Sequence, residues 1–304
     1  MKVILVEILI VVVVAVVLYA IRNKIRFFRG GYVVRKDSYM QDDKMKILVE
    51  DTHLWSGKAK GNRSIRVDGT NLIYSRIPLD KAENALLVYG YCAPFLSMQN
   101  GTGASIKRAL VLGGGGGAVP LYILQNYENA KVDVVEINAD SIRMCEKYFL
   151  QDYVGENARA NMILDDAKNA VKTLEPTYQF IFCDLYIGGQ PVDAVYDPAF
   201  MKEVSRLAGS NGMLAINGGS LSFPGMRVVL ACLLSTFKNA WAFLGNEGFV
   251  LLASNRDMPA VDNMLMQANG VVLLHPNMLQ DDVLKAIGDE LNGIQPEEEK
   301  APEV

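Results

Sequence analysis

The chain has 304 residues, half of which are apolar, and a formal net charge of −4. This composition supports a substantial globular core, and the lack of a strong positive charge argues against a nucleic-acid-binding protein. With two histidines, and four cysteines that lie far apart in apolar surroundings, neither a metal site nor a disulfide framework is expected.

The N-terminal segment is the most hydrophobic part of the sequence. Residues 3–21 are apolar except for Glu7, and a helix of about 19 residues nearly spans the hydrocarbon core of a bilayer. One cation precedes this run and four follow it, so the positive-inside rule predicts a single-pass membrane anchor at residues 1–22, with the C-terminal domain cytoplasmic. A cleaved signal peptide is the alternative, although no small-residue cleavage site precedes the cations.

The next segments predict a linker and then a small β unit. Residues 23–44 are basic and then mixed in character, which indicates a juxtamembrane linker. Three short strand-like runs follow, and Asp68-Gly69 stands between two of them. Because Asp-Gly between strand-like runs is a strong hairpin signal, we expect an antiparallel β unit at residues 45–80.

From residue 109 onward, apolar strand-like runs alternate with helical runs across short loops. This alternation predicts an α/β domain at residues 81–293, opened by a helix at 81–98 and built on a parallel sheet with helices on both faces. The last residues, 294–304, form an acidic tail that we expect to be disordered.

A run of five glycines separates the first of these strands from its helix. Gly113, Gly115 and Ala118 fit the pattern G-x-G-x-x-A, which brings the backbone close to a ligand. Glu136 ends the next strand, 21 residues after Gly115, where a carboxylate accepts hydrogen bonds from ribose hydroxyls. The pattern predicts an adenosine-containing ligand, either NAD or an S-adenosyl compound.

Two further strands also end in carboxylates. Asp165-Asp166-Ala167 follows the third strand, where Asp166 can meet an adenine amino group, and Asp184 follows the fourth. Acidic residues at three successive strand ends suit a sulfonium cation and an amine better than a pyrophosphate. An S-adenosyl ligand is therefore preferred, and an NAD-dependent dehydrogenase is the rival class.

The motifs resemble those of a known family. In chain order, "VLGGGGGAVP", "VDVVEINADSI", "ILDDAKNAV", "YQFIFCDLYIGGQPVDAVYDPAFMKEV" and "GMLAIN" are similar to the motifs of the spermidine/spermine synthase family. That family is a branch of the class I S-adenosylmethionine-dependent methyltransferase fold. The resemblance covers about residues 45–255, and it implies a Rossmann-like sheet with a small N-terminal β unit, and a homodimer as one expected assembly.

The resemblance also implies roles for individual residues. Glu136 would hold the ribose, and Asp184 would orient and deprotonate the attacking amine. Asp166, with Ala167 beside the ring, would contact the adenine. The loop under the amino-acid or aminopropyl side of the ligand would be formed by Gly113, Gly115 and Gly117.

Other positions depart from the family pattern. Gly116 stands where the family has an aspartate that helps to hold the aminopropyl amine, and Leu72 stands near the place of a family glutamine. The family's Tyr-His-Glu element is replaced by "VYGYC", and its second acidic residue after Asp184 is missing unless Asp193 substitutes for it. Tyr186 is expected to face the pocket.

These features predict a membrane-anchored transferase. It would use S-adenosylmethionine or its decarboxylated form and transfer a methyl or aminopropyl group to a small-molecule acceptor, an amine. The departures weigh against an authentic polyamine aminopropyltransferase (spermidine synthase), which stays as an alternative. The three retained carboxylates weigh against the other alternative, a catalytically inactive nucleoside-binding or interaction module.

Overall fold

The computed structural model describes residues 24–41, 43–55, 61–83, 85, 106–155, 159–175, 178–187, 190–219, 223–245, 248–255 and 272–274. The predicted anchor, nearly all of the predicted helix at 81–98, and the acidic tail lie outside these residues. None of the helices within these ranges combines the length and the hydrophobicity that crossing a membrane requires.

Two compact units make up the described part of the chain. The first contains the described residues of Met1–Tyr89, Gly114–Glu128 and Glu136–Leu164. The second contains those of Gly90–Gly113, Asn129–Val135 and Asp165–Val304.

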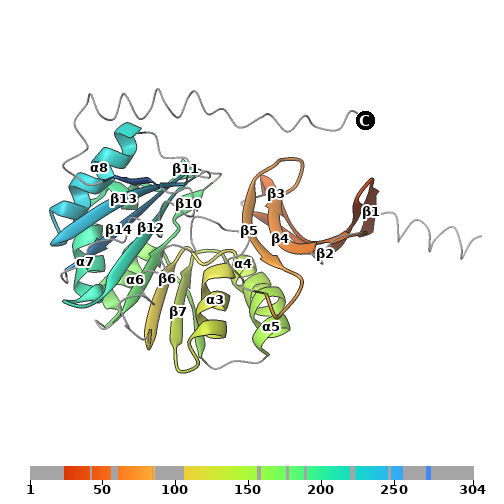
Figure 1. Ribbon diagram of the computed structural model, residues 1–304, viewed down its shortest axis with the longest axis horizontal. Helices are drawn as coiled ribbons and strands as arrows, with labels where there is room; N and C mark the ends of the chain where they lie inside the picture. The colour runs from red at the N-terminus through yellow and green to blue at the C-terminus, as the bar shows by residue number, and fades with distance from the viewer. Residues whose placement is uncertain are drawn as a thin grey trace, which may run out of the picture. The chain divides into compact units, whose positions relative to one another are not determined.

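An antiparallel sheet of five strands dominates the first unit, and its strands follow their order in the sequence (Figure 1). The turn between the last two strands contains Asp68-Gly69, and Gly69 has the positive φ of 73° that such a turn needs. The predicted hairpin is therefore confirmed. The strands are β1 (Ile25–Phe28), β2 (Gly31–Gln41), β3 (Met45–Leu54), β4 (Gly61–Val67) and β5 (Ile73–Pro78).

The structure corrects the predicted linker at residues 23–44, because β1 and β2 lie there. The strand β2 pairs with β3 from Gly31 to Gln41, with a bulge between Arg35 and Asp37, and Val33 and Tyr39 are buried. In the sequence, the charged residues Arg35 and Lys36 interrupt the apolar pattern of this strand. Each forms an ion pair with a carboxylate of β3, Arg35 with Glu50 at 3.8 Å and Lys36 with Asp51 at 3.9 Å.

The helices of the first unit follow the glycine loop and β7. The helix α3 (Ala118–Asn126) is the first of the helical runs that alternate with the strands. The second run is capped by Asn138 and consists of α4 (Ala139–Met144), the π-helical turn η1 (Cys145–Gln151) and α5 (Asp152–Val154). Arg63 of β4 ties the sheet to this helix by donating to Asp51 at 2.6 Å and to the carbonyl of Tyr148 at 2.7 Å.

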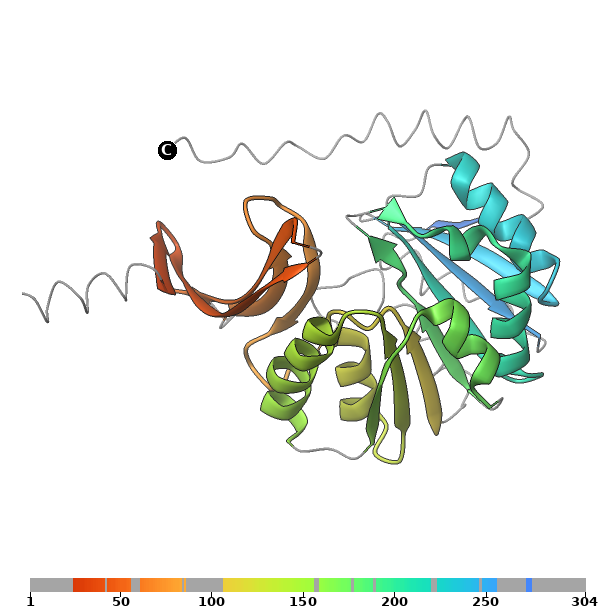
Figure 2. The same ribbon diagram turned by 180° about the vertical axis from the view of Figure 1, so that it is seen from behind.

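The second unit contains most of the α/β sheet (Figure 2). Its central strands pair in parallel: β6 (Arg108–Leu112) with β7 (Lys131–Glu136) and with β9 (Phe180–Cys183), and β9 with β12 (Met213–Gly219). Their side chains are almost entirely buried, as expected for a covered sheet. The hydrogen-bonded order of the full sheet is β15-β13-β14-β12-β9-β6-β7-β8, where β8 is Ala160–Leu164.

The α/β prediction is therefore confirmed for the described residues, with one refinement, because the sheet is mixed. The strands β13 (Asn239–Gly245), β14 (Gly248–Ser254) and β15 (Val272–Leu274) are antiparallel to their partners. The remaining elements of this unit are α6 (Ala167–Thr173), β10 (Tyr186–Ile187), β11 (Gln190–Pro191), η2 (Asp193–Tyr196), α7 (Pro198–Ala208) and α8 (Phe223–Leu234).

Candidate functional site

The predicted loop at residues 113–117 connects β6 to α3. Gly113 and Gly117 have φ angles of 83° and 69°, in the left-handed region that favours glycine. A Cβ atom at Gly117 would lie 2.8 Å from Cys145 Sγ and from Phe149 Cβ, both on the π-helical turn. The sequence therefore needs glycine at both ends of this loop for reasons of backbone geometry and packing.

Gly113 lies against the residue that follows β9, and both residues belong to the second unit. Its N–H donates to the carbonyl of Val135 at 2.9 Å, and a Cβ atom would overlap the carbonyl oxygen of Asp184. The N–H of Asp184 donates to the carbonyl of Leu112 at 2.8 Å. Two residues that the sequence analysis selected independently, Gly113 and Asp184, are thus in direct contact.

Asp184 is partly buried, and a side-chain amide orients it. Its Oδ1 accepts a hydrogen bond from Asn217 Nδ2 at 2.8 Å, and the hydroxyl of Tyr186 donates to the carbonyl of Asn217 at 3.0 Å. Burial raises the pKa of Tyr186, and the charge of Asp184 adds to this rise, so the hydroxyl keeps its proton at neutral pH.

The sequence analysis missed Asn217. The signal was present in "GMLAIN", because β12 runs parallel to β9 and both strands therefore end at the same edge of the sheet. An amide at the end of β12 is placed to meet a carboxylate just after β9.

Glu136 is held by backbone N–H groups in the first unit. Its Oε1 accepts from the N–H of Asn138 at 2.9 Å, and its Oε2 lies 3.2 Å from the place where a Cβ of Gly115 would be. Burial raises the pKa of Glu136, while hydrogen bonds from the N–H groups of Asn138, Ile137 and Gly115 act in the opposite direction. Gly115 and Glu136, both predicted from the sequence, therefore lie together.

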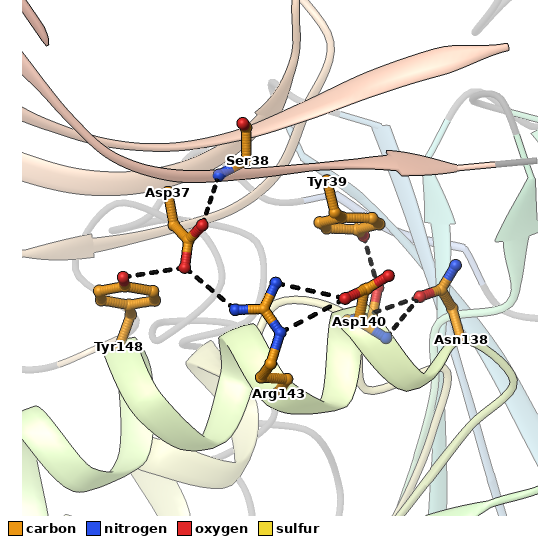
Figure 3. Close-up of polar contacts among 8 residues, drawn as sticks. Asp37, Ser38, Tyr39, Asn138, Asp140, Arg143 and Tyr148 are labelled. Atoms are coloured by element: carbon orange, nitrogen blue, oxygen red, sulfur yellow. Dashed lines mark hydrogen bonds and ion pairs between the residues drawn. The ribbon is translucent and has the colours of Figure 1, made fainter. Parts of the chain in front are cut away.

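A chain of hydrogen bonds connects β2 to Glu136, and Figure 3 shows its part between Tyr39 and Asn138. Tyr39 and Ser141 share a buried hydrogen bond of 2.7 Å between their hydroxyls, and the N–H of Ser141 donates to Asn138 Oδ1 at 3.0 Å. Asn138 in turn donates its N–H to Glu136. Burial raises the pKa of Tyr39 to about 12, and the charge of Glu136 adds to this rise. The sequence analysis missed Tyr39 because it lay within the predicted linker.

Gly116 has a neighbour that explains why no aspartate stands there. A Cβ atom at Gly116 would overlap the Cβ and Oγ atoms of Ser75, a residue of β5 that is only 2% exposed. In this chain the side chain of Ser75 occupies the space that a side chain at position 116 would need. The residue at position 116 is therefore restricted by its contact with Ser75.

The remaining predicted residues lie at the start of α6. Asp166 is the N-cap of this helix, where its Oδ1 accepts from the N–H of Lys168 at 2.8 Å, and Ala167 is buried. The Asp166 carboxylate is exposed, so its second oxygen faces solvent. Asp193 is exposed at the start of η2, and the segment "VYGYC" lies outside the described residues.

An exposed apolar residue directly follows Glu136. Ile137 is 65% exposed, an unusual value for an isoleucine at the end of a buried strand. The sequence analysis did not select it. The ribose role of Glu136 and the roles of the other selected residues stay predictions.

Comparison with known proteins supports the resemblance to the spermidine/spermine synthase family. Residues 96–224 match the family model described as the spermine/spermidine synthase domain. The polyamine aminopropyltransferase of Clostridium acetobutylicum is 31% identical over 112 residues, which are 36% of this chain and 39% of that protein. The polyamine aminopropyltransferase of Prochlorococcus marinus is 27% identical over 173 residues, 50% of this chain and 61% of that protein.

A solved structure supports the fold. The crystal structure of a probable spermidine synthase from Corynebacterium glutamicum has a TM-score of 0.65 at 15% identity, covering 81% of this chain and 93% of that one. The chain spans only about two fifths of the length of the first curated relatives that it matches. Residues 96–224 are thus similar to the spermine/spermidine synthase domain, and the described part of the chain has the α/β fold of a spermidine synthase-like protein.

Proposed function

We propose that the chain is a transferase that binds S-adenosylmethionine or its decarboxylated form and transfers an alkyl group to a small amine. The observation that carries the proposal is the Glu136 carboxylate, fixed by backbone N–H groups beside Gly115. A carboxylate fixed in this way accepts hydrogen bonds from two ribose hydroxyls without first losing conformational freedom. The polyamine aminopropyltransferases among the relatives support the same class of reaction.

Asp184 supplies the acid–base chemistry in this proposal. A free amine with a pKa near 10 is protonated at neutral pH, so the attacking nitrogen must lose a proton before it acts as a nucleophile. The nitrogen lone pair forms a bond to the carbon next to the sulfonium, the C–S bond breaks, and its electron pair stays on sulfur as a neutral thioether. Asp184 takes up the proton, and Asn217 fixes the position of its Oδ1.

Position 116 bears on which ligand and acceptor are used. Ser75 leaves no room for an aspartate at Gly116, so the amine of decarboxylated S-adenosylmethionine lacks the partner that the resemblance assigns to it. This observation favours a ligand or acceptor other than those of standard polyamine synthesis. The relatives favour the second candidate, an authentic aminopropyltransferase.

Calorimetric titration tests the proposal. S-adenosylmethionine, decarboxylated S-adenosylmethionine, methylthioadenosine and NAD are titrated separately into the full chain in detergent. We expect binding of at least one adenosyl ligand and none of NAD. Binding of NAD alone would overturn the proposal in favour of a dehydrogenase, and binding of none would leave the inactive module. Once an acceptor is identified, unchanged turnover by Asp184→Asn would remove the assigned base.

We further propose that residues 1–22 anchor the protein in a membrane with the C-terminal domain in the cytoplasm. The support is the sequence alone: the apolar run at 3–21 and the cations after it. Cell fractionation with protease protection tests this, and a mature protein that begins near residue 30 would contradict it in favour of a cleaved signal peptide.

A further inference from the structure

Four aromatic side chains gather at one end of the five-stranded sheet: Phe27, Tyr32, His53 and Trp55, called here the aromatic corner. Tyr32 lies directly opposite Phe27 on β1 and opposite His53 on β3, so these side chains share one face of the sheet. The rings of Tyr32 and His53 stack at 4.7 Å, and the ring of Trp55 lies 5.2 Å from that of Tyr32. The four rings therefore contact one another and form one continuous aromatic surface.

This surface is unusually exposed for its composition. Phe27 is 65% exposed and Trp55 is 58% exposed, although their rings also stack on each other at 6.3 Å. The backbone beneath is fixed, because the N–H of Trp55 donates to the carbonyl of Gly30 in the turn between β1 and β2 at 2.9 Å. Rigid exposed aromatic rings indicate a partner that removes them from water.

The opposite face of the sheet is apolar at the same end. Phe28 and Leu54 alternate along their strands with the residues of the aromatic corner. Phe28 of β1 and Leu54 of β3 both pair with Gly31 of β2, one on each side. They are 43% and 41% exposed. A protein partner that docks on one face would cover only one of these two sets. A lipid interface, which surrounds whatever enters it, would cover both.

The charge around the corner points to the same partner. Residues 24–36 contain five cations and no acidic residue, in a chain whose net charge is −4: Lys24, Arg26, Arg29, Arg35 and Lys36. Arg35 and Lys36 form ion pairs with carboxylates of β3. Lys24, Arg26 and Arg29 are exposed, and none of them forms an ion pair with a described residue. Such cations are attracted to anionic lipid headgroups.

The position in the sequence completes the argument. The strand β1 begins four residues after the apolar run at 3–21, which is about long enough to cross a bilayer. Trp and Tyr side chains concentrate where such segments leave the membrane, because their rings prefer the headgroup region. We propose that the aromatic corner and the cations beside it dock on the anionic surface of a phospholipid bilayer. This inference rests on the proposed anchor and not on the proposed transfer reaction.

The two tryptophans of the chain, Trp55 and Trp241, make the proposal measurable. In Trp241→Phe, the sole remaining tryptophan is Trp55. The full chain is placed in nanodiscs of phosphatidylcholine and phosphatidylglycerol whose acyl chains carry bromine close to the headgroup. We expect the Trp55 emission to fall by at least about half relative to unbrominated lipid, because bromine quenches indole only at close range. An unchanged emission would overturn the proposal.

Two control variants distinguish docking from mere proximity to the bilayer. Trp55→Phe retains only Trp241 on β13 and should show no quenching. The second control is Met40→Trp in a chain that also carries Trp55→Phe and Trp241→Phe. Met40 is an exposed apolar residue of β2. It lies about 26 Å along the strand from Tyr32 and should be quenched far less. Equal quenching at positions 40 and 55 would contradict docking through the corner.

The cations are tested in the same system. Arg26→Gln/Arg29→Gln should reduce the quenching of Trp55 at least about twofold in anionic nanodiscs, with little change in purely zwitterionic ones. Emission that shifts with protein concentration in detergent, without quenching by brominated lipid, would assign the corner to a second copy and overturn the proposal. Flotation of the full chain with vesicles reports on the anchor separately, so an anchored but unquenched protein would refute only this inference.

Discussion

The two carboxylates to which the proposed function assigns roles are held in different ways. Glu136 in the first unit accepts hydrogen bonds from backbone N–H groups, and the hydrogen-bond chain from Tyr39 stands behind them. Asp184 in the second unit follows a strand end and is oriented by the side chain of Asn217. A backbone-held carboxylate suits a fixed binding role, whereas a carboxylate held by a side-chain amide can adjust as it takes up a proton.

Two glycines of the loop are required for different reasons. A side chain at position 113 would overlap the backbone carbonyl of Asp184, and no substitution elsewhere removes a backbone atom. Gly116 is required by the side chain of Ser75, which a second substitution can remove. The loop thus has one position that is fixed by the fold and one that is set by its neighbour.

The largest expected effect is at Gly113. Gly113→Ala should lower the free energy of unfolding by about 3 kcal/mol or more, because the methyl group meets a carbonyl oxygen at a positive φ. Gly69→Ala is the matched control, since Gly69 has a φ of 73° with nothing within 4 Å of its Cβ position, and should cost about 1 kcal/mol. Urea denaturation measures both, and equal losses would show that the contact with Asp184 is unimportant.

The next effect distinguishes position 116 from position 113. Gly116→Asp alone should lower the free energy of unfolding by about 2 kcal/mol, because the new side chain overlaps buried Ser75. Ser75→Gly in the same chain should recover more than half of that loss. The two substitutions are thus expected to be strongly non-additive. Additive losses in denaturation experiments would show that Ser75 does not set the residue at position 116.

A smaller effect tests the hydrogen-bond chain from Tyr39 to Glu136. Tyr39→Phe and Tyr148→Phe each remove one hydroxyl hydrogen bond between β2 and the helical run at 139–154, to Ser141 and to Asp37 respectively (Figure 3). Each should lower the free energy of unfolding by about 1 kcal/mol. Only Tyr39→Phe should also weaken adenosyl-ligand binding in calorimetry, by about threefold, or roughly 0.6 kcal/mol. Equal affinities in the two variants would limit Tyr39 to a structural role.

The smallest effect is a pH dependence. Because the folded-state pKa of Glu136 is raised, its proton stabilises the fold at low pH, and this contribution is lost as the pH rises through the raised pKa. The stability of the wild type relative to Glu136→Gln should therefore fall as the pH rises from below 4.5 and then level off. Urea denaturation at a series of pH values measures this difference, and a difference that grows with pH would have the wrong sign.

Much of the fold and the family could be predicted from the sequence. The alternating apolar runs indicated the strands and helices from β6 to β14, because buried parallel strands leave little room for polar residues. Asp68-Gly69 indicated the hairpin through its turn chemistry. The resemblance to the spermidine synthase family is confirmed by the family model and by the relatives.

The parts that could not be predicted depend on contacts distant in the sequence. The strand β2 was taken for a linker because Arg35 and Lys36 interrupt its apolar pattern, and their partners lie on β3. Ser75 and Gly116 are 41 positions apart, and no local pattern in the sequence connects them. Tyr39 and Asn217 reach their carboxylates only through sheet register and helix capping, which a single sequence does not reveal.

The most direct test of the account removes both sides of the proposed ribose contact. Methylthioadenosine and its analogue without ribose hydroxyls are titrated into the wild type and into Glu136→Ala. The account predicts that Glu136→Ala weakens binding of methylthioadenosine by at least about tenfold, or 1.4 kcal/mol, and changes binding of the analogue little. Equal losses for the two ligands would contradict the assignment of Glu136 to the ribose.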